Sequence, residues 1–241
     1  MHLNHPPDDI TTKAISDGMT VDALKWEVYD HDNNKRLYDG TVSESAVVNG
    51  KKQFVLELNL VSNLKYDLLF WAQKSGTGVY NTEDLTDVHY AKTWNGSEND
   101  ADCLYSNQES YEAYYATEFI SDGDKKSRTV VLKRPFAQIN LGTTNDVPAD
   151  EYTVAMTASS VTVKNVPTTF NVATRAVSDV VDEFTFALSE DLPKEPLVAG
   201  GKTYDYAAMN YIFAGGNIEL DYTINTMLTP TALGSSKTPA T

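Results

Sequence analysis

The sequence lacks the residues on which several common classes of protein depend. Its 241 residues include a single cysteine, Cys103, so the chain forms no internal disulfide and builds no cysteine-based zinc site. A lone cysteine is more often a small buried apolar residue than a nucleophile. No run of 18 apolar residues occurs, so the sequence predicts no membrane-spanning helix. The first seven residues also lack the basic and apolar regions of a secretion signal; either the protein stays inside the cell or the sequence begins after a removed leader.

Positive charge is scarce as well. The chain has 19 Lys and Arg residues against 34 Asp and Glu residues, which gives a formal net charge of −15. Phosphate backbones and anionic bilayers both need a cationic surface, so we expect no nucleic-acid partner and no electrostatic docking to a membrane. A solvated acidic surface explains the excess of negative charge.

The motifs of common catalytic sites are missing. No HExxH, GxSxG, GxGxxG or phosphate-binding loop is present. His89 has Asp84 and Asp87 nearby in the sequence, but a surface histidine beside carboxylates is far more often solvated than catalytic.

One stretch imitates the start of a calcium-binding loop. Asp30, Asp32 and Asn34 have the spacing of three ligands, but Lys35 stands at the obligatory glycine position and Thr41 at that of the bidentate glutamate. A tight turn between two strands explains these residues better. The sequence therefore predicts no metal, no cofactor and no catalytic residue, and we expect a protein that is not an enzyme.

What the sequence does contain is a period of two. Apolar and polar residues alternate in residues 24–29, 54–58, 152–156, 184–188 and 218–225. Such alternation places one face of a strand toward a core and the other toward solvent. In the first run, the expected buried face consists of Leu24, Trp26 and Val28, and the expected solvent face of Lys25, Glu27 and Tyr29. Residues 65–73 (KYDLLFWAQ) are apolar on both faces, as in a central strand.

Long helical periodicity is missing. At most one or two helical turns fit residues 106–115, with Ser106 or Asn107 as the cap. Many short strands, separated by turn dipeptides at roughly 8–12-residue spacing, are typical of β-sandwiches. The sequence therefore predicts an all-β fold with minimal helix and connections of Greek-key type.

Pro135 divides the chain. Because proline cannot donate to a strand ladder, it ends a strand or lies at a sheet edge. We expect an N-terminal leader segment over residues 1–19, β-sandwiches over residues 20–133 and 134–226, and a disordered Thr/Ser/Pro-rich tail over residues 227–241. Residues 76–107 are expected to form a long loop.

Five stretches occur in an order that is typical of one family. They are residues 12–18 (TKAISDG), 21–30 (VDALKWEVYD), 66–73 (YDLLFWAQ), 114–119 (YYATEF) and 132–142 (LKRPFAQINLG). The last is the most specific, because a basic-Pro-Phe-Ala-Gln string that enters the second domain is characteristic of the fimbrillins of Bacteroidales, the subunits of type V pili. The chain resembles this family over about residues 10–226.

The resemblance implies two transthyretin-like β-sandwiches, export as a lipoprotein precursor, and assembly at the cell surface into a fimbria attached to the outer membrane. It also implies a trypsin-like processing protease, which would cut the Lys13–Ala14 bond and remove a first strand that includes Ile10, Thr11 and Thr12. A strand of another pilin subunit would then fill the exposed edge and apolar core. Head-to-tail donation of this kind does not close on itself, so it builds a filament.

Two features depart from the family pattern. The family favours arginine at the cut, where this chain has Lys13. Family members continue with further strands after the segment that corresponds to residues 217–226, whereas residues 226–241 have no alternating apolar face. Either the gene is truncated or the C-terminal sandwich is completed in another way.

Other functions stay open beside a structural pilin. The chain is an adhesin module at a fibre tip if Tyr90 and Trp94, in the expected loop, form a contact surface for a glycan or protein on a host or bacterial surface. A carboxylate-based glycoside hydrolase is less favoured, because 34 acidic residues allow many pairs and no pair stands out. The leading hypothesis is a fibre subunit that works through edge hydrogen bonding and core burial.

Overall fold

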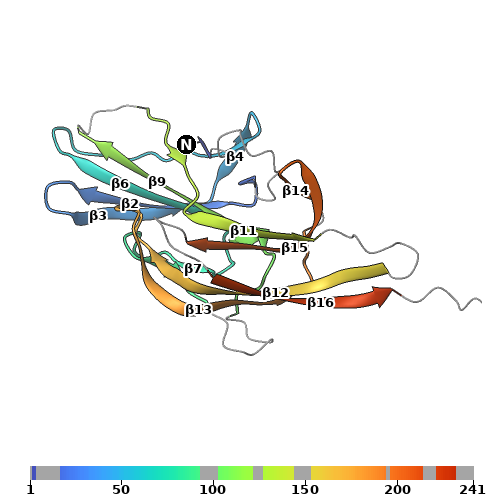
Figure 1. Ribbon diagram of the computed structural model, residues 1–241. Coiled ribbons are helices and arrows are strands. Elements are labelled where there is room, and N and C mark those ends of the chain that lie inside the picture. The colour runs from blue at the N-terminus through green and yellow to red at the C-terminus, as the bar shows by residue number, and fades with distance from the viewer. Residues whose placement is uncertain are drawn as a thin grey trace, which may run out of the picture.

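The computed structural model describes residues 2–3, 17–92, 103–121, 127–143, 153–193, 196–213 and 221–231. They form an all-β fold of several sheets (Figure 1), as the sequence predicts. Within these residues the helical content is one 3-10 turn, η1 (Glu109–Tyr111). No helix in the described part of the chain is long and apolar enough to cross a membrane.

The strands alternate along the whole described chain with short turns and irregular segments. In chain order they are β1 (His2–Leu3), β2 (Ala23–Asp30), β3 (Lys35–Val42), β4 (Ser45–Val48), β5 (Lys51–Phe54), β6 (Tyr66–Gln73), β7 (Tyr80–Asn81), β8 (Val88–Tyr90), β9 (Ala113–Ile120), β10 (Val131–Leu132), β11 (Phe136–Thr143), β12 (Thr153–Phe170), β13 (Val177–Ser189), β14 (Leu197–Ala199), β15 (Lys202–Phe213) and β16 (Asp221–Thr231). Pro135 lies between β10 and β11, which confirms that it separates two strands.

The antiparallel sheet β3-β2-β6-β9 has an apolar core on each face. Along β6, Leu69 and Trp71 belong to one core, which we call the first core. Leu68 and Phe70 belong to the other, which we call the second core. Because successive residues of a strand point to opposite faces, this alternation confirms that residues 65–73 form a central strand that is buried on both sides.

The first core is a cluster of aromatic rings around Trp71. The ring centroids of Tyr80, Phe136, Phe170 and Phe213 lie 5.4–6.4 Å from that of Trp71, within the range in which aromatic pairs attract one another. Segments on both sides of Pro135 therefore contribute to this core. The division of the chain into domains at residues 133–134 stays a prediction.

Strand β12 connects early and late parts of the chain through backbone pairing. It pairs antiparallel with β13 and β16, which lie beside it in the lower part of Figure 1, and with β8 at Thr169↔His89 and Phe170↔Val88. Strands β7 and β8 fall within residues 76–107, for which the sequence predicts a loop. That prediction is wrong for these two strands, because β8 finds part of its pairing in a strand about 80 residues away in the sequence, which no local pattern reveals.

Residues 104–107 join β13 to β15. The N–H of Ala187 in β13 donates to the carbonyl of Leu104 at 2.7 Å, and the Ala187 carbonyl accepts from the N–H of Ser106 at 2.9 Å. On the other side, the N–H of Asn107 donates to the carbonyl of Met209 in β15 at 2.9 Å, and Asn107 Oδ1 accepts from the N–H of Met209 at 2.8 Å. This short segment therefore bridges two sheets.

The side chain of Asn107 is used in this bridge and does not cap a helix. Its Nδ2 donates to Ser159 Oγ at 2.8 Å, and the N-cap position of η1 is occupied by Gln108, which makes no side-chain cap. The predicted cap at Ser106 or Asn107 is thus wrong, because both residues are committed to the sheets on either side.

Three further local predictions differ from the structure. β5 ends at Phe54, although the alternation predicts a strand to Leu58; Leu56 and Leu58 pack against the second core without joining a ladder. β16 continues to Thr231, so residues 227–231 belong to a sheet and not to a disordered tail, while residues 232–241 lie outside the described residues. Glu27, expected in solvent, is fully buried because both faces of its sheet are covered.

We expect Asn107→Ala to lower the free energy of unfolding by about 2–4 kcal/mol. The substitution leaves the buried N–H of Met209 and hydroxyl of Ser159 without these partners, and it forces alanine to a φ of 65°. The matched control is Asn49→Ala, at a φ of 51° in an exposed turn, which should cost only about 1 kcal/mol. Chemical denaturation measures both, and equal losses would contradict the role given to the buried hydrogen bonds.

Candidate functional site

Strand β1 occupies a slot between two strands that are remote in sequence. It pairs antiparallel with β5 at His2↔Gln53 and parallel with β10 at Leu3↔Leu132. The sheet order is β10-β1-β5-β4, so β1 is what joins β10 to β5. Beside it, Phe54 and Leu132 are fully buried members of the second core. We call this arrangement the β1 slot; Figure 1 shows the N-terminus close to β4.

The processing residues that the sequence predicts cannot be placed next to this slot directly. Lys13 and Ala14, with Ile10, Thr11 and Thr12 of the expected first strand, lie outside the described residues. The structure does show a paired strand, β1, that precedes the Lys13–Ala14 bond in the sequence. A cut at that bond would separate β1 from every later strand.

The predicted contact surface is not formed by Tyr90. Its side chain is only 7% exposed, and its ring lies 4.8 Å, between centroids, from those of Phe184 and Phe213 in the first core. Burial raises the pKa of the Tyr90 hydroxyl well above its ordinary value. The prediction is wrong for Tyr90 because this residue belongs to β8, whose alternation turns Val88 and Tyr90 into the first core. Trp94 lies outside the described residues.

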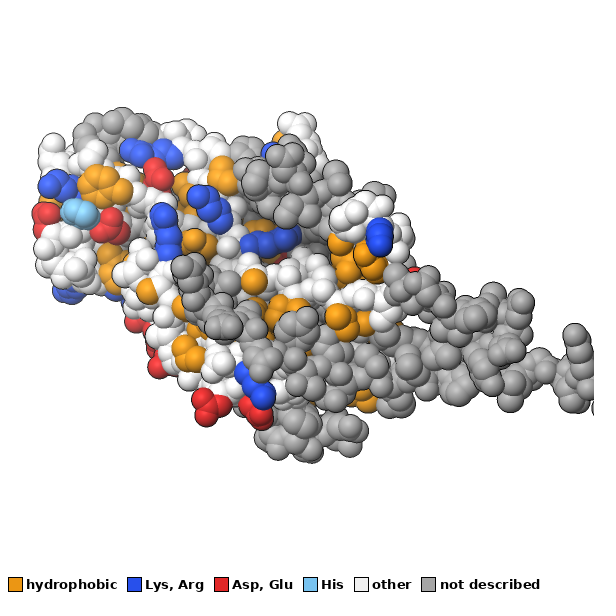
Figure 2. Space-filling model, in the orientation of Figure 1, with side chains coloured by type: hydrophobic (Ala, Val, Ile, Leu, Met, Phe, Trp, Pro, Cys, Tyr) orange, Lys and Arg blue, Asp and Glu red, His pale blue; other side chains and the backbone are white. Residues whose placement is uncertain are grey.

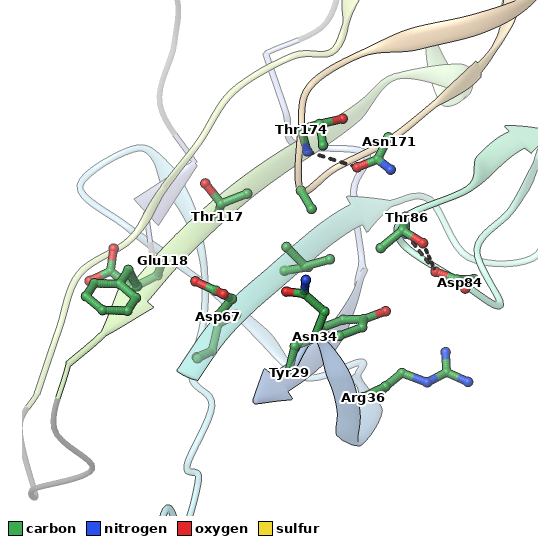
Figure 3. Close-up of a pocket in the computed structure, with 14 residues that line it drawn as sticks. Tyr29, Asn34, Arg36, Asp67, Asp84, Thr86, Thr117, Glu118, Asn171 and Thr174 are labelled. Carbon is green, nitrogen blue, oxygen red and sulfur yellow. Dashed lines mark hydrogen bonds between the residues drawn. The ribbon is translucent and has the colours of Figure 1, made fainter. Parts of the chain in front are cut away.

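A polar groove of about 770 Å³ lies beside the sheet β3-β2-β6-β9. It is bordered by the β2–β3 turn, parts of β6 and β9, the segment after β7 and the turn between β12 and β13 (Figure 3). Asn34, Asp67 and Thr117 line one part, and Thr86 and Asn171 line another. Every bordering segment lies within the described residues and outside the predicted sites.

The β2–β3 turn holds its shape through local hydrogen bonds. Asp30 Oδ1 accepts from the N–H of Asp32 at 2.9 Å, and the Asp30 carbonyl accepts from the N–H of Asn34 at 2.9 Å. Asn34 adopts a φ of 56°, which asparagine tolerates better than most residues. These bonds confirm that residues 30–34 form a tight turn, and they place Asn34 on the groove.

The fully buried carboxylate of Glu27 organises one wall of the groove. Its Oε1 accepts from Arg36 Nη1 at 2.9 Å, and its Oε2 accepts from the Tyr29 hydroxyl at 2.8 Å and the N–H of Leu85 at 3.1 Å. Arg36 Nη1 also donates to the carbonyl of Glu83 at 2.9 Å. Partial burial and the bond to Glu27 raise the pKa of Tyr29 well above its ordinary value, so its hydroxyl stays a donor. Glu27 therefore joins β2, β3 and residues 83–85.

Acidic groups on the groove have nearby partners. Glu118 Oε1 accepts from Arg128 Nη1 at 2.9 Å, and Asp67 Oδ2 lies 2.7 Å from His31 Nδ1. Figure 2 shows acidic and basic side chains interspersed at the end of the molecule that carries the β2–β3 turn. This end therefore does not present a field of one sign.

Asp84 is held in its ionised form. Partial burial raises its pKa, but the hydrogen bonds from the hydroxyl and N–H of Thr86, at 2.7 and 2.8 Å, and the charge of Arg36 outweigh burial and bring the pKa below its ordinary value. Within the described residues, no group of three His, Cys, Asp or Glu side chains is arranged to hold a metal ion. The groove thus offers fixed hydrogen-bonding groups on an ordered wall.

Sequence reasoning missed Glu27. The alternation of β2 assigns it to solvent together with Lys25 and Tyr29. A signal was present in the pairing: a hairpin between residues 24–29 and 36–42 brings Arg36 to the same end of the sheet as Glu27. Burial of the carboxylate, however, depends on the segment around Leu85, which the sequence leaves in a loop.

We expect Glu27→Ala to lower the free energy of unfolding by about 3 kcal/mol or more, because it leaves the buried N–H of Leu85 unpaired and removes the partner of Arg36. Asp39→Ala is the control: its ion pair with Lys25 lies at the surface and should contribute at most about 1 kcal/mol. Thermal and chemical unfolding of both variants measure the difference, and similar small losses would show that Glu27 does not organise the wall.

Comparison with solved structures finds likenesses that are remote. A protein of Bacteroides ovatus, provisionally described as an adhesin, has 14% identity and a TM-score of 0.44, over 86% of this chain and 66% of that chain. A Bacteroides thetaiotaomicron protein, provisionally described as polysaccharide-binding (DUF1812), also has 14% identity and a TM-score of 0.44, over 88% and 68%. A fimbrial assembly protein of Parabacteroides distasonis has 12% identity and a TM-score of 0.38, over 92% and 95%.

These likenesses assign no activity or partner to this chain, which also spans slightly less than two thirds of the first of those proteins. No curated protein matches the sequence. A family model does match, and it covers residues 2–235, nearly the whole chain. The chain therefore belongs to DUF6562, a family of unknown function.

Proposed function

We propose that this protein is a structural subunit of a cell-surface fimbria and that it joins its neighbours by strand exchange. The observation that supports this proposal most directly is the β1 slot, in which residues from the start of the sequence supply a strand between β10 and β5. The fimbrillin-like order of motifs in the sequence points to the same class of protein.

Removal of β1 would leave two strand edges without their shared partner. The backbone N–H and C=O groups of β5 and β10 that face β1 would then lack hydrogen bonds, next to the buried residues Phe54 and Leu132. A strand from a second subunit would pair with both edges at once, and its main-chain bonds would supply affinity. The surface that donates the strand differs from the slot that accepts it, so the contact repeats into a filament.

The proposed trigger is proteolysis at Lys13–Ala14 by a trypsin-like enzyme. This bond lies between β1 and β2 in the sequence, so cleavage detaches β1 from the rest of the chain. The cleaved segment is then held by few ladder bonds and can be displaced. Export as a lipoprotein precursor and a place at the cell surface form part of the same proposal, with other pilin subunits and the protease as partners.

We expect limited trypsin treatment to cut after Lys13, release a peptide that contains β1, and start assembly of the trimmed protein into larger species. Lys13→Gln should prevent both the release and the assembly. Mass spectrometry identifies the peptide, and light scattering after size-exclusion chromatography follows assembly.

The matched control is Arg175→Gln. Arg175, like Lys13, precedes an alanine; it is exposed in the turn between β12 and β13, and its loss should leave release and assembly unchanged. An excess of a synthetic peptide of residues 1–13 should slow assembly, because it refills the slot. Trimmed protein that stays monomeric at high concentration, or Lys13→Gln protein that assembles as readily as the parent after trypsin treatment, would contradict the proposal.

A further inference from the structure

We infer that the polar groove between the β2–β3 turn and the β12–β13 turn binds a short neutral oligosaccharide. The inference does not depend on fibre assembly, because the groove and the β1 slot share no residue. It rests on the shape of the groove, the chemistry of its lining and the placement of one exposed aromatic ring.

The groove has the size and rigidity of a ligand site. About 770 Å³ falls within the range of small-molecule sites and leaves room for about two or three sugar rings. Segments from several distant parts of the chain converge on it, and the buried Glu27 network ties three of them together. A wall that is held in place before binding loses little freedom when a ligand binds.

The lining matches the hydroxyl groups of a sugar. Amide, carboxylate and hydroxyl groups of Asn34, Asp67, Thr86, Thr117 and Thr174 all border the groove (Figure 3). Together they offer both donors and acceptors, which a polyhydroxylated ligand needs because each hydroxyl does both. The Asn34 side chain lies at the groove in Figure 3 and makes no hydrogen bond to another described residue, so its amide is available.

The charges at the groove favour a ligand without net charge. Of the ionisable groups that line the groove, Asp67, Asp84 and Glu118 are acidic, and Arg36 is basic and already bonded to Glu27. Arg128 and Arg175 lie beside this lining, bonded to Glu118 and Thr117, so the groove carries charges of both signs and no single sign dominates. Neutral hydroxyls can hydrogen-bond to groups of either sign. The expected ligand is therefore uncharged.

Phe119 supplies an apolar platform. Its side chain is 47% exposed, although it lies on the groove, and its ring is 4.7 Å between centroids from that of His31. The electron-rich face of an aromatic ring attracts the weakly positive C–H groups of a sugar face, and covering the ring removes apolar area from water. A groove with polar groups around one exposed ring is suited to a ligand that has one apolar and several polar faces.

The test is titration of the full, untrimmed chain with defined trisaccharides, followed by calorimetry or two-dimensional NMR. The neutral probes are cellotriose, maltotriose, mannotriose and the N-acetylglucosamine trimer, and the acidic probe is sialyllactose. We expect at least one neutral probe to bind with a dissociation constant of about 1 mM or tighter, and sialyllactose to bind more weakly.

Two variants remove groove contacts without touching the core. Phe119→Ala takes away the platform, and Asn34→Gly takes away the amide while glycine keeps the positive φ of the turn. Each should weaken binding of that probe by about tenfold. Their controls are Tyr38→Ala, an aromatic residue of β3 that is 50% exposed and outside the groove, and Asn49→Gly in another exposed turn. Both controls should bind within about twofold of the parent.

The outcomes separate clearly. Loss of affinity in the two groove variants and not in the controls supports the inference. Absence of binding for every neutral probe at about 10 mM would overturn it, as would equal affinity in parent and groove variants or preferential binding of sialyllactose. Because the measurement uses untrimmed protein, a failure of strand exchange leaves its result unaffected.

Discussion

The rule that a buried strand edge must be paired governs this structure. Backbone donors and acceptors that face neither water nor a partner are costly, so each edge needs a neighbouring strand or another polar group. The β1 slot meets this need with residues from the beginning of the sequence, and residues 104–107 meet it between β13 and β15. In both places a short segment hydrogen-bonds to the backbone of strands that are distant from it in the chain. Of the two segments, β1 is the one that a single cut in the sequence could detach.

The second feature of the architecture is a sheet with two buried faces. Because β6 sends Trp71 into the first core and Phe70 into the second, the sheet β3-β2-β6-β9 is held from both sides. The second core reaches the β1 slot through Leu132, and the first core reaches β12 through Phe170. This double burial explains why Glu27 is enclosed, and hence why a carboxylate with several hydrogen bonds stands beside the polar groove. A fibre subunit of this design would keep its groove while it exchanges the strand at its slot, since the two lie in different parts of the molecule.

Local sequence patterns predict where the strands are better than they predict which segments pair with or cover them. Alternation correctly identifies β2 and parts of β12, β13 and β16, the apolar run of residues 65–73 identifies β6, and proline chemistry identifies the break at Pro135. What local patterns miss is set by long-range contacts: Tyr90 is buried against Phe184 and Phe213, and Glu27 is enclosed where a distant segment donates to it. The end of β5 at Phe54 has the same origin, since Leu56 and Leu58 find cover against the second core without a strand partner. The groove could not be predicted at all, because its residues come from segments that only the folded chain brings together.

Hydrogen exchange at the slot tests strand exchange most directly. The backbone amides of β5 and β10 that face β1 should be protected in the intact chain, whereas the other edge of β5 pairs with β4. Strand exchange predicts that this protection falls when the segment before Ala14 is cleaved and removed, and that it returns in the assembled fibre, while amides of β6 stay protected throughout. Protection of the amides that face β1 that does not change on removal of the segment would contradict the proposed role of β1.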